Sequence, residues 1–503
     1  MKSQTQVLHK FARGAVVAAF LVLVGCGSND SSNPATTINA SPYVPANFDW
    51  KACDESASTT SVQCGTLEVP FDYNNPSAGT FTLYVKLLPA ANPTLRIGSM
   101  MVNPGGPGFG GSSLADDASY YFSSDIIDHF DIIAWDPRGT GKSTPAIDCV
   151  DDYDQYFGID SPPDSPEEKQ ALIDASQAFN DECMDNSGEI LPYISTQASA
   201  TDMNSIRQAL GEDKISYFGF SYGSELGATW ATMFPQTVRA AVFDGAVDPQ
   251  ATSAQEGMAQ AGGFEGQLTT FLAACSKNST CAFYNGGKAE AAFDSLLLEL
   301  DAKPLVVTKD RTPVTQGVAF TAVAQAMYSD SYWPQLEQAL ADAQQGDGAG
   351  LLKLYDDYYQ RKDDGSYGNE LEAFLAISCL DDPGASSVKE VEDAVQDFVA
   401  AAPRLGANFG YGYSCALWPV KPATKIDATG KGAGPIVVIG TTGDPATPLA
   451  STRKMAAALE QGILLIVKAN QHTGYGANEC INTAVDSYLI DLTVPVNETT
   501  CKS

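Results

Sequence analysis

The sequence predicts an α/β protein in which helices cover both faces of a mostly parallel sheet and a large helical domain interrupts that sheet. Up to Pro249, short β-branched or aromatic runs alternate with longer helix-like stretches, which is typical of a parallel sheet. Residues 251–430 then contain many helix formers and almost no strand-like runs, and the alternation resumes at Pro435. About 180 residues are too many for a structureless connection, so we expect an inserted domain between two parts of one sheet.

Each strand of this sheet can be placed on the sequence. The expected strands are a leading antiparallel pair at 66–70 and 81–88, and then 99–102, 130–135, 215–218, 239–243, 435–440 and 463–468. A helix is expected at 201–210, with Thr201 as its N-cap, and another at 224–234. The chain then divides into a signal peptide at 1–25, a flexible tether at 26–43, a first core part at 44–250, a helical cap domain at 251–430 and a second core part at 431–503.

The N-terminus carries a targeting signal rather than a structural element. Lys2, Lys10 and Arg13 precede an apolar run at 15–24, which is about ten residues long, whereas a bilayer span needs ~20. The run ends in Leu23-Val24-Gly25-Cys26, which resembles the bacterial lipobox, where the cysteine is acylated. We therefore expect export to the cell envelope with a lipid anchor on Cys26 as the membrane contact, and the alternative is a plain signal peptide with a chance cysteine.

The composition excludes several classes of protein. Hydrophobic residues make up 44% of the chain, which rules out disorder and coiled-coil arrays. Acidic residues outnumber basic ones by 61 to 29, giving a net charge of −32, whereas a surface that binds the phosphate backbone of a nucleic acid needs clustered cations. We therefore expect no nucleic-acid partner, and we expect a monomer.

The cysteines indicate an oxidising compartment. Of the eleven, removal of Cys26 leaves ten, an even number, and none forms a CxxC pair. Pairing each with its neighbour along the chain predicts the disulfides Cys53–Cys64, Cys149–Cys183, Cys275–Cys281, Cys379–Cys415 and Cys480–Cys501.

A serine nucleophile is predicted in Gly219-Phe220-Ser221-Tyr222-Gly223. This G-x-S-x-G motif follows an expected strand and precedes an expected helix, which is the context that the motif requires. Side chains next to the nucleophile would clash in such a turn, and the glycines avoid this. The turn projects the hydroxyl of Ser221 at the edge of the sheet and aims the next amide, on Tyr222, at the same space.

The serine needs a base, and only three histidines occur in the chain. His9 leaves with the signal peptide, and His129 lies before an expected strand, away from the edge where catalytic loops gather. His472 follows the strand at 463–468 and is the predicted base. Asp444, in the loop after the strand at 435–440, is the predicted orienting acid, with Asp244 as its rival.

A glycine-rich loop, Asn103-Pro104-Gly105-Gly106-Pro107-Gly108, is expected to hold the oxyanion, with the amides of Gly106 and Tyr222 as donors.

Residues 106–111 also fit the dinucleotide pattern G-x-G-x-x-G, with Asp131 further along, but Pro107 stiffens the loop and an exported protein meets little nicotinamide cofactor. A phosphate-binding loop at 139–143 fails because its first glycine is replaced by Asp136. Two remaining histidines are too few for most metal sites, so we expect no metal and no cofactor.

Several motifs together resemble the tripeptidyl-aminopeptidase branch of the α/β-hydrolases, which is related to the prolyl aminopeptidases. They are the glycine-rich loop, Phe130-Asp-Ile-Ile-Ala-Trp-Asp-Pro-Arg-Gly-Thr-Gly141, the Ser221 motif, Phe243-Asp-Gly-Ala-Val-Asp-Pro249, Ala376-Ile-Ser-Cys379, Cys415-Ala-Leu-Trp-Pro419 and Gly443-Asp444. The resemblance runs from about residue 60 to residue 480. It implies the α/β-hydrolase fold and an exported, cofactor-free serine exopeptidase that removes short peptides, such as tripeptides, from free N-termini.

An aminopeptidase must also pair with the ammonium group of its substrate, so a carboxylate is expected near the pocket. Glu225, Asp381 and Asp382 are the candidates, although each is also one acid among 61. Glu225, one turn after the nucleophile, departs from the uncharged residue that we expect in many relatives, which leaves the substrate side open.

Two other functions stay open. A carboxylesterase or lipase would use the same three residues on small esters, and a requirement for a free amine would separate it from a peptidase. A catalytically silent lipoprotein that binds peptides would fail to react with a fluorophosphonate. Epoxide and haloalkane hydrolysis require an aspartate at the position of Ser221 and are excluded.

Overall fold

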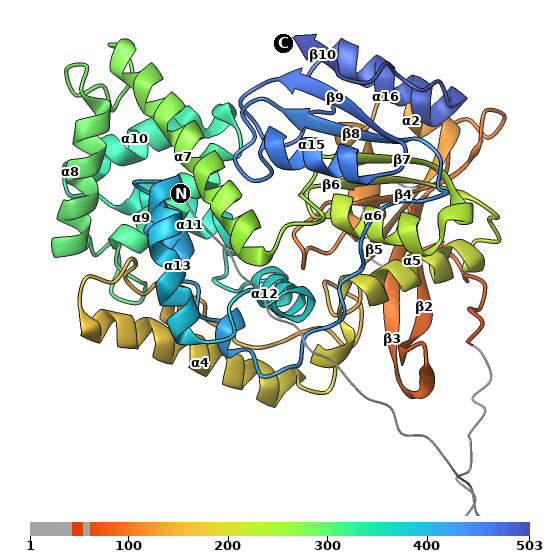
Figure 1. Cartoon of the computed structure of the whole chain (residues 1–503), viewed down its shortest axis with the longest axis horizontal. Helices are drawn as coiled ribbons and strands as arrows, with labels where there is room; N and C mark the ends of the chain where they lie inside the picture. Colours follow the sequence, from red (N-terminus) through yellow and green to blue (C-terminus); the bar gives the residue numbers. More distant parts are fainter. Residues whose placement is uncertain (1–42, 54–60, 503) are drawn as a thin grey trace, which may run out of the picture. The chain divides into compact units, whose positions relative to one another are not determined.

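One sheet runs through the α/β part of the molecule (Figure 1). The computed structural model describes residues 43–53 and 61–502, and in this part of the chain ten strands follow the order β1-β2-β3-β5-β4-β6-β7-β8-β9-β10. The pairs β1–β2, β2–β3 and β3–β5 are antiparallel, and all others are parallel. The strands are β1 (Lys51–Ala52), β2 (Gln63–Asp72), β3 (Asn75–Leu88), β4 (Gly98–Asn103), β5 (Phe130–Asp136), β6 (Ile215–Phe220), β7 (Val238–Asp244), β8 (Ile436–Thr441), β9 (Gly462–Lys468) and β10 (Thr499–Lys502).

The eight strands expected from the sequence are confirmed as β2 to β9, and two edge strands were not expected. β10 is only four residues long and pairs parallel with β9. Its Cys501 is buried and joined to Cys480 in α16 (Glu479–Asp491), which ties the short strand to the sheet. A four-residue strand held by a disulfide gives no hydrophobic pattern that could be recognised in the sequence.

Helices cover both faces of the sheet, as the sequence predicts. On one face, a hydrophobic cluster joins the sheet to α5, α6 and α15, and on the other face a separate cluster joins it to α1, α2 and α16. The helices outside the insertion are α1 (Ala118–Tyr121), α2 (Ser124–His129), α3 (Asp154–Phe157), α4 (Pro166–Ser187), α5 (Thr196–Ala209), α6 (Gly223–Met233), α15 (Leu449–Ala458) and α16.

The expected N-cap at Thr201 is wrong. Helix α5 begins at Thr196, and the Ser195 side chain caps it by accepting the amide of Ala198 at 3.3 Å. Thr201 lies within the helix, where its hydroxyl donates back to the carbonyl of Gln197 at 3.0 Å. Both threonine and serine favour caps, but a threonine inside a helix can bond to the preceding turn, so the residue type alone did not locate the start. The helix expected at 224–234 is confirmed as α6, shifted by one residue.

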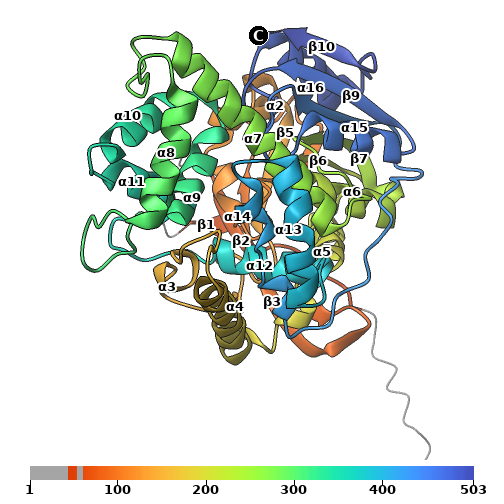
Figure 2. The same cartoon turned by 60° about the vertical axis from the view of Figure 1, so that its left-hand side comes forward.

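A helical insertion separates β7 from β8, as expected. Its helices α7 to α11 lie together beside the sheet (Figure 2) and share a hydrophobic cluster with Phe398 of α13. Helix α12 instead packs into the core cluster of the sheet through Ala373, Ala376 and Ile377. The inserted helices are α7 (Ser253–Lys277), α8 (Ala289–Ala302), α9 (Gln316–Met327), α10 (Trp333–Ala343), α11 (Ala349–Tyr358), α12 (Glu370–Asp381), α13 (Val388–Ala401) and α14 (Gly406–Gly410). The domain boundaries at 250 and 430 stay predictions.

The arginine of the 130–141 motif has a structural role. Arg138 is fully buried and forms a bidentate pair with Asp202 of α5, at 2.7 and 2.6 Å. Its remaining N–H groups donate to the carbonyl oxygens of Pro70, Phe71 and Tyr193. All five donors of the guanidinium are therefore used, and they hold α5 against the strand β2.

The structure contains the five disulfides that pair neighbouring cysteines, Cys53–Cys64, Cys149–Cys183, Cys275–Cys281, Cys379–Cys415 and Cys480–Cys501. So many disulfides in one chain are typical of a protein that folds outside the cytoplasm. Among the described residues, no helix is both long and apolar enough to cross a membrane. The signal peptide, Cys26 and nearly all of the tether lie outside the described residues.

Candidate active site

Ser221 sits on a strained turn at the carboxyl end of β6. Its φ of 54° is in the left-handed region that non-glycine residues rarely adopt. The turn is held by a hydrogen bond from the Ser221 amide to the carbonyl of Asp244 at the end of β7, at 2.8 Å. The strain is therefore supported by the neighbouring strand, and the serine leads directly into α6.

The glycines of the motif are required by close contacts. A Cβ on Gly219 would lie 2.3 Å from the carbonyl oxygen of Gly223, and a Cβ on Gly223 would lie 2.9 Å from Oδ1 of Asn103. Neither distance is possible for a real side chain. The sequence prediction that flanking side chains would clash in this turn is therefore confirmed.

His472 and Asp444 form the ion pair of the site. Nδ1 of His472 lies 2.9 Å from Oδ1 and 3.0 Å from Oδ2 of Asp444, whose side chain is fully buried. The amides of Ala446 and Thr447 donate to Oδ1 at 3.0 and 2.8 Å, and the Thr447 hydroxyl donates to Oδ2 at 3.0 Å. The carboxylate is thus fixed from its own loop, and it in turn fixes the orientation of the imidazole.

The other ring nitrogen of His472 forms no hydrogen bond with Ser221 in this structure. Nε2 is buried and has no hydrogen-bond partner among the residues that the structure describes. Burial lowers the pKa of the imidazole, but the charge of Asp444, the hydrogen bond to it and the charge of Asp244 together raise the pKa above its usual value. Gly245, the residue after Asp244, lies against the ring of His472. A Cβ on Gly245 would lie 3.0 Å from Cε1 of His472.

The rival acid, Asp244, has a different role. It is fully buried, and its two carboxylate oxygens accept the amides of Gly474 and Tyr475 at 2.7 and 2.8 Å. Burial raises the pKa of Asp244 to about 7, although these two hydrogen bonds oppose the shift. Asp244 therefore holds the backbone after His472, whereas Asp444 contacts the ring.

The glycine-rich loop lies directly against the serine turn. A Cβ on Gly105 would come within 2.8 Å of the Cβ of Ser221 and 3.3 Å of the amide nitrogen of Tyr222. The Gly105 amide donates to Oδ1 of Asn103 at 3.0 Å. The amides of Gly106 and Tyr222 donate to no group within residues 43–53 and 61–502.

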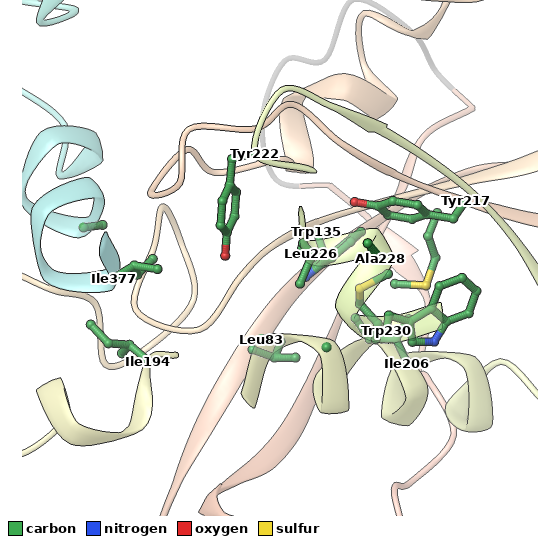
Figure 3. Close-up of a cluster of buried hydrophobic side chains, with 14 of the residues drawn as sticks. Leu83, Trp135, Ile194, Ile206, Tyr217, Tyr222, Leu226, Ala228, Trp230 and Ile377 are labelled. Carbon is green, nitrogen blue, oxygen red and sulfur yellow. The ribbon is translucent and has the colours of Figure 1, made fainter. Parts of the chain in front are cut away.

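Tyr222 links the serine turn to an acid of the inserted helices. Figure 3 shows its ring on the side of Ile194 and Ile377, away from Tyr217 and Trp230. A hydrogen bond joins the hydroxyl groups of Tyr222 and Thr196, and the Thr196 hydroxyl donates to Asp381 at 2.6 Å. The Thr196 amide donates to the same carboxylate at 3.0 Å, and burial raises the pKa of Asp381 to about 7. Asp381 is therefore already used to bind the start of α5.

The other two predicted substrate acids, Asp382 and Glu225, differ in the hydrogen bonds that their carboxylates accept. Asp382 accepts the amides of Ser253, the first residue of α7, and of Gly384, both at 3.0 Å. The carboxylate of Glu225 lies 3.9 Å from Lys425, and burial together with the charge of Asp382 raises the pKa of this carboxyl against the effect of Lys425. Of the three predicted acids, Glu225 is the one whose carboxylate accepts no hydrogen bond in the described part of the chain.

Glu256 was missed in the sequence. Both oxygens of its carboxylate are buried and lack hydrogen-bond partners in the described residues. Burial, together with the charges of Asp248 and Glu225, raises the pKa of Glu256 to about 7. In the sequence it is an ordinary acid in the first turn of a helix, and only the packing of α7 brings its charge close to that of Glu225.

The inserted helices also hold the histidine loop. The amide of His472 donates to the carbonyl of Tyr328, after α9, at 2.8 Å, and the two rings pack edge to face with centroids 5.7 Å apart. The amide of Asp330 donates to the carbonyl of Asn470 at 3.1 Å. No sequence pattern could have predicted these contacts, or that of Thr447, because they join segments that are far apart or depend on the shape of one loop.

One close group of possible metal ligands occurs in the described residues, and it consists of Cys275, Cys281 and Glu337. The two sulfurs are bonded to each other, so they offer no thiolate. The expectation of a cofactor-free site stays a prediction.

The fold and the Ser221 turn define a serine hydrolase of the α/β class. The chain belongs to the α/β-hydrolase fold family, whose sequence model matches residues 98–476. It is 33% identical to the serine protease Hip1 of Mycobacterium tuberculosis over 512 residues, covering 97% of this chain and 96% of the relative. It is 35% identical to carboxylesterase B of the same organism, covering 92% and 91%, and 29% identical to tripeptidyl aminopeptidase of Streptomyces lividans, covering 94% and 90%.

Proposed function

We propose that this serine hydrolase is an aminopeptidase that releases short peptides, such as tripeptides, from free N-termini. Ser221 attacks the scissile carbonyl, and His472 takes its proton while Asp444 stabilises the imidazolium. The amides of Gly106 and Tyr222 hold the oxyanion, a contribution of about 3–4 kcal/mol per donor. His472 then gives the proton to the leaving amine, and water releases the acyl-enzyme.

The observation that favours a peptidase is the pair of neighbouring carboxyl groups of Glu225 and Glu256, whose pKa values are raised mainly by burial. Lys425 acts on both acids, and it lies 3.9 Å from Glu225 while also donating to the carbonyl of Ala251. The ammonium group of a peptide would stabilise the ionised form of these carboxyl groups.

A carboxylesterase is the second candidate, since the relative named carboxylesterase B shares 35% identity with this chain. Acyl transfer to water uses the same serine, histidine and aspartate on either substrate. The two functions differ in whether the site reads a free amine.

Hydrolysis of an Ala-Ala-Ala anilide by a chain that begins at Gly27 tests the proposal, with the amine free and then acetylated. We expect cleavage of the free form alone, and Ser221→Ala should abolish it. Equal cleavage of both forms, or rapid turnover of nitrophenyl esters with neither anilide cleaved, would favour the esterase.

We also propose that the protein is exported as a monomer and anchored by a lipid on Cys26. The disulfides support export, and the anchor rests on the sequence before residue 27. Labelled fatty acid should be incorporated into the intact chain and lost in Cys26→Ala, which should also release the protein from the membrane fraction. Incorporation into both chains would disprove the assignment of Cys26.

A further inference from the structure

A cavity of about 500 Å³ lies beside the histidine loop, and none of the catalytic steps proposed above uses it. Its walls come from the segment before α2, the loop that begins at Pro104, the end of β6 and the loop around His472. The lining residues are Pro104, Leu114, Tyr120, Tyr121, Phe220, Gln471, Thr473, Tyr475 and Gly476.

The position of the cavity relates it to the leaving group. Gln471 and Thr473 flank His472, and Phe220 directly precedes Ser221. In the proposed reaction, His472 must give a proton to the leaving amine, so that amine lies next to the imidazole. A cavity walled by both neighbours of the histidine and by the residue before the serine is therefore placed to receive the part of the substrate beyond the scissile bond.

The lining of the cavity is neutral and aromatic. None of its nine residues is charged, although the chain carries 61 acids. A second cavity of about 510 Å³ elsewhere on the molecule is lined by Asp148, Asp151, Glu370 and Glu372 among others, so hollows in this protein are not neutral by default.

Aromatic rings continue from the cavity to the surface. The rings of Tyr121 and Phe220 have centroids 6.0 Å apart, and those of Tyr120 and Tyr121 are 5.1 Å apart. Tyr120 is 85% exposed and Tyr121 is 38% exposed, so the rings form an open apolar rim rather than part of the core. Exposed aromatic groups of this kind are typical of binding surfaces.

We propose that this cavity binds the residue on the leaving-group side of the scissile bond and selects a large apolar or aromatic side chain there. The proposal rests on the acyl-enzyme of the proposed function. The peptide chain beyond that residue would leave across Tyr120, which is open to solvent. An acidic side chain would be disfavoured, because the cavity offers it no cation.

Acyl transfer measures this selection directly. When an amine replaces water, its nitrogen attacks the acyl carbon, the bond to Ser221 Oγ breaks, and His472 moves the amine's proton to the serine. The intact protein would be acylated with a nitrophenyl ester of Ala-Ala-Ala in the presence of the amides of phenylalanine, glycine or aspartate. At equal concentrations of the unprotonated amines, the ratio of transfer to hydrolysis compares how well the acceptors bind, since all of them meet the same acyl-enzyme.

We expect phenylalanine amide to intercept the acyl-enzyme at least about tenfold better than glycine amide, with aspartate amide the poorest. Tyr121→Ala and Tyr120→Ala should reduce this preference to about threefold or less, and Tyr121→Phe should keep it. Leu298→Ala, which removes a 67% exposed side chain from α8, is the control and should change nothing.

Equal interception by all three acceptors, or a preference that persists in both alanine variants, would overturn the proposed subsite while leaving the hydrolase intact. Absence of ester turnover in the folded protein would overturn the proposed catalytic function and the subsite with it.

Discussion

Two buried aspartates contact the histidine loop, and their hydrogen bonds separate their roles. The carboxylate of Asp444 accepts a hydrogen bond from Nδ1 of His472, whereas that of Asp244 accepts hydrogen bonds from the amides of Gly474 and Tyr475. The sequence could not distinguish them fully, because both follow strands at the same edge of the sheet. The difference arises from the path of the loop after His472, which turns at Thr473 with a φ of 69°.

This difference predicts unequal effects of two matched substitutions. Asp444→Asn should lower kcat about 10⁴-fold, because the imidazole loses the acceptor that fixes its tautomer. Asp244→Asn should lower kcat far less and should mainly lower Tm, because an amide offers one acceptor for two backbone donors. Steady-state kinetics and thermal melts of both variants would check this, and equal losses of kcat would contradict it.

Glu256 is predicted to reduce stability at alkaline pH. Its pKa is about 7 in the fold, so the unfolded chain releases this proton first and stability falls as pH rises from about 4.5 to 7. Glu256→Gln should raise the free energy of unfolding by about 1–3 kcal/mol at pH 8 and much less at pH 5. If Glu256 attracts the substrate amine, the same variant should raise KM for peptides with a free N-terminus. Urea denaturation at both pH values and peptide kinetics would measure the two effects, and an equal gain at both pH values would contradict the first.

Among the elements, helix α7 of the insertion packs directly against the loop that carries Asp444. A Cβ on Gly263 would lie 2.3 Å from the carbonyl oxygen of Pro445, so the helix touches the loop backbone. Gly263→Ala should displace the loop and lower kcat by about 10–100-fold, since small displacements of catalytic groups are costly.

Gly266→Ala is the matched control for that substitution. It lies on the same helix, and a Cβ placed on it would meet no other atom within 4 Å. It should keep full activity and stabilise the helix slightly, because alanine loses less conformational freedom than glycine. Similar kinetics for the two alanine variants would show that the contact at Gly263 does not position the Asp444 loop.

The attachment of helix α5 to the sheet is predicted to depend on the buried ion pair of Arg138 and Asp202. Asp202→Ala leaves an uncompensated buried charge and should cost about 3–5 kcal/mol of stability. The exposed pair of Lys389 and Asp393 is the comparison, and Asp393→Ala should cause no measurable loss. Chemical denaturation followed by circular dichroism would test both, and a small loss for Asp202→Ala would refute the structural role of Arg138.

For the whole molecule, stability is expected to fall between pH 5 and pH 8. Four buried carboxyl groups have pKa values of about 7 in the fold, namely Asp244, Glu256, Glu372 and Asp381. Where such a group is ionised only in the unfolded chain, it lowers the free energy of unfolding by about 1.4 kcal/mol per pH unit. The raised pKa of His472 acts in the same direction, because its stabilising charge is lost as pH rises through that value. We expect Tm to fall by about 5 °C or more, and a Tm that rises over this range in a pH series would contradict the prediction.

The sequence predicted most of the sheet and the order of the site residues, but not what the insertion adds. Buried strands such as β6 and β8 are continuous apolar runs, so they were recognisable. His472 could be predicted as the base because few histidines compete with it, and the structure places its ring against Asp444. Glu256, Tyr328 and the aromatic cavity were not predicted, because each depends on how segments distant in sequence pack, and no local pattern records that packing.

The long insertion between β7 and β8 also sets the order in which the site is made. Ser221 lies before it, whereas Asp444 and His472 lie after it, so a ribosome completes the nucleophile more than two hundred residues before the base. A chain that is still being synthesised or translocated therefore has a serine that nothing activates. In the proposed mechanism, hydrolysis begins only when the last part of the sheet has joined the first.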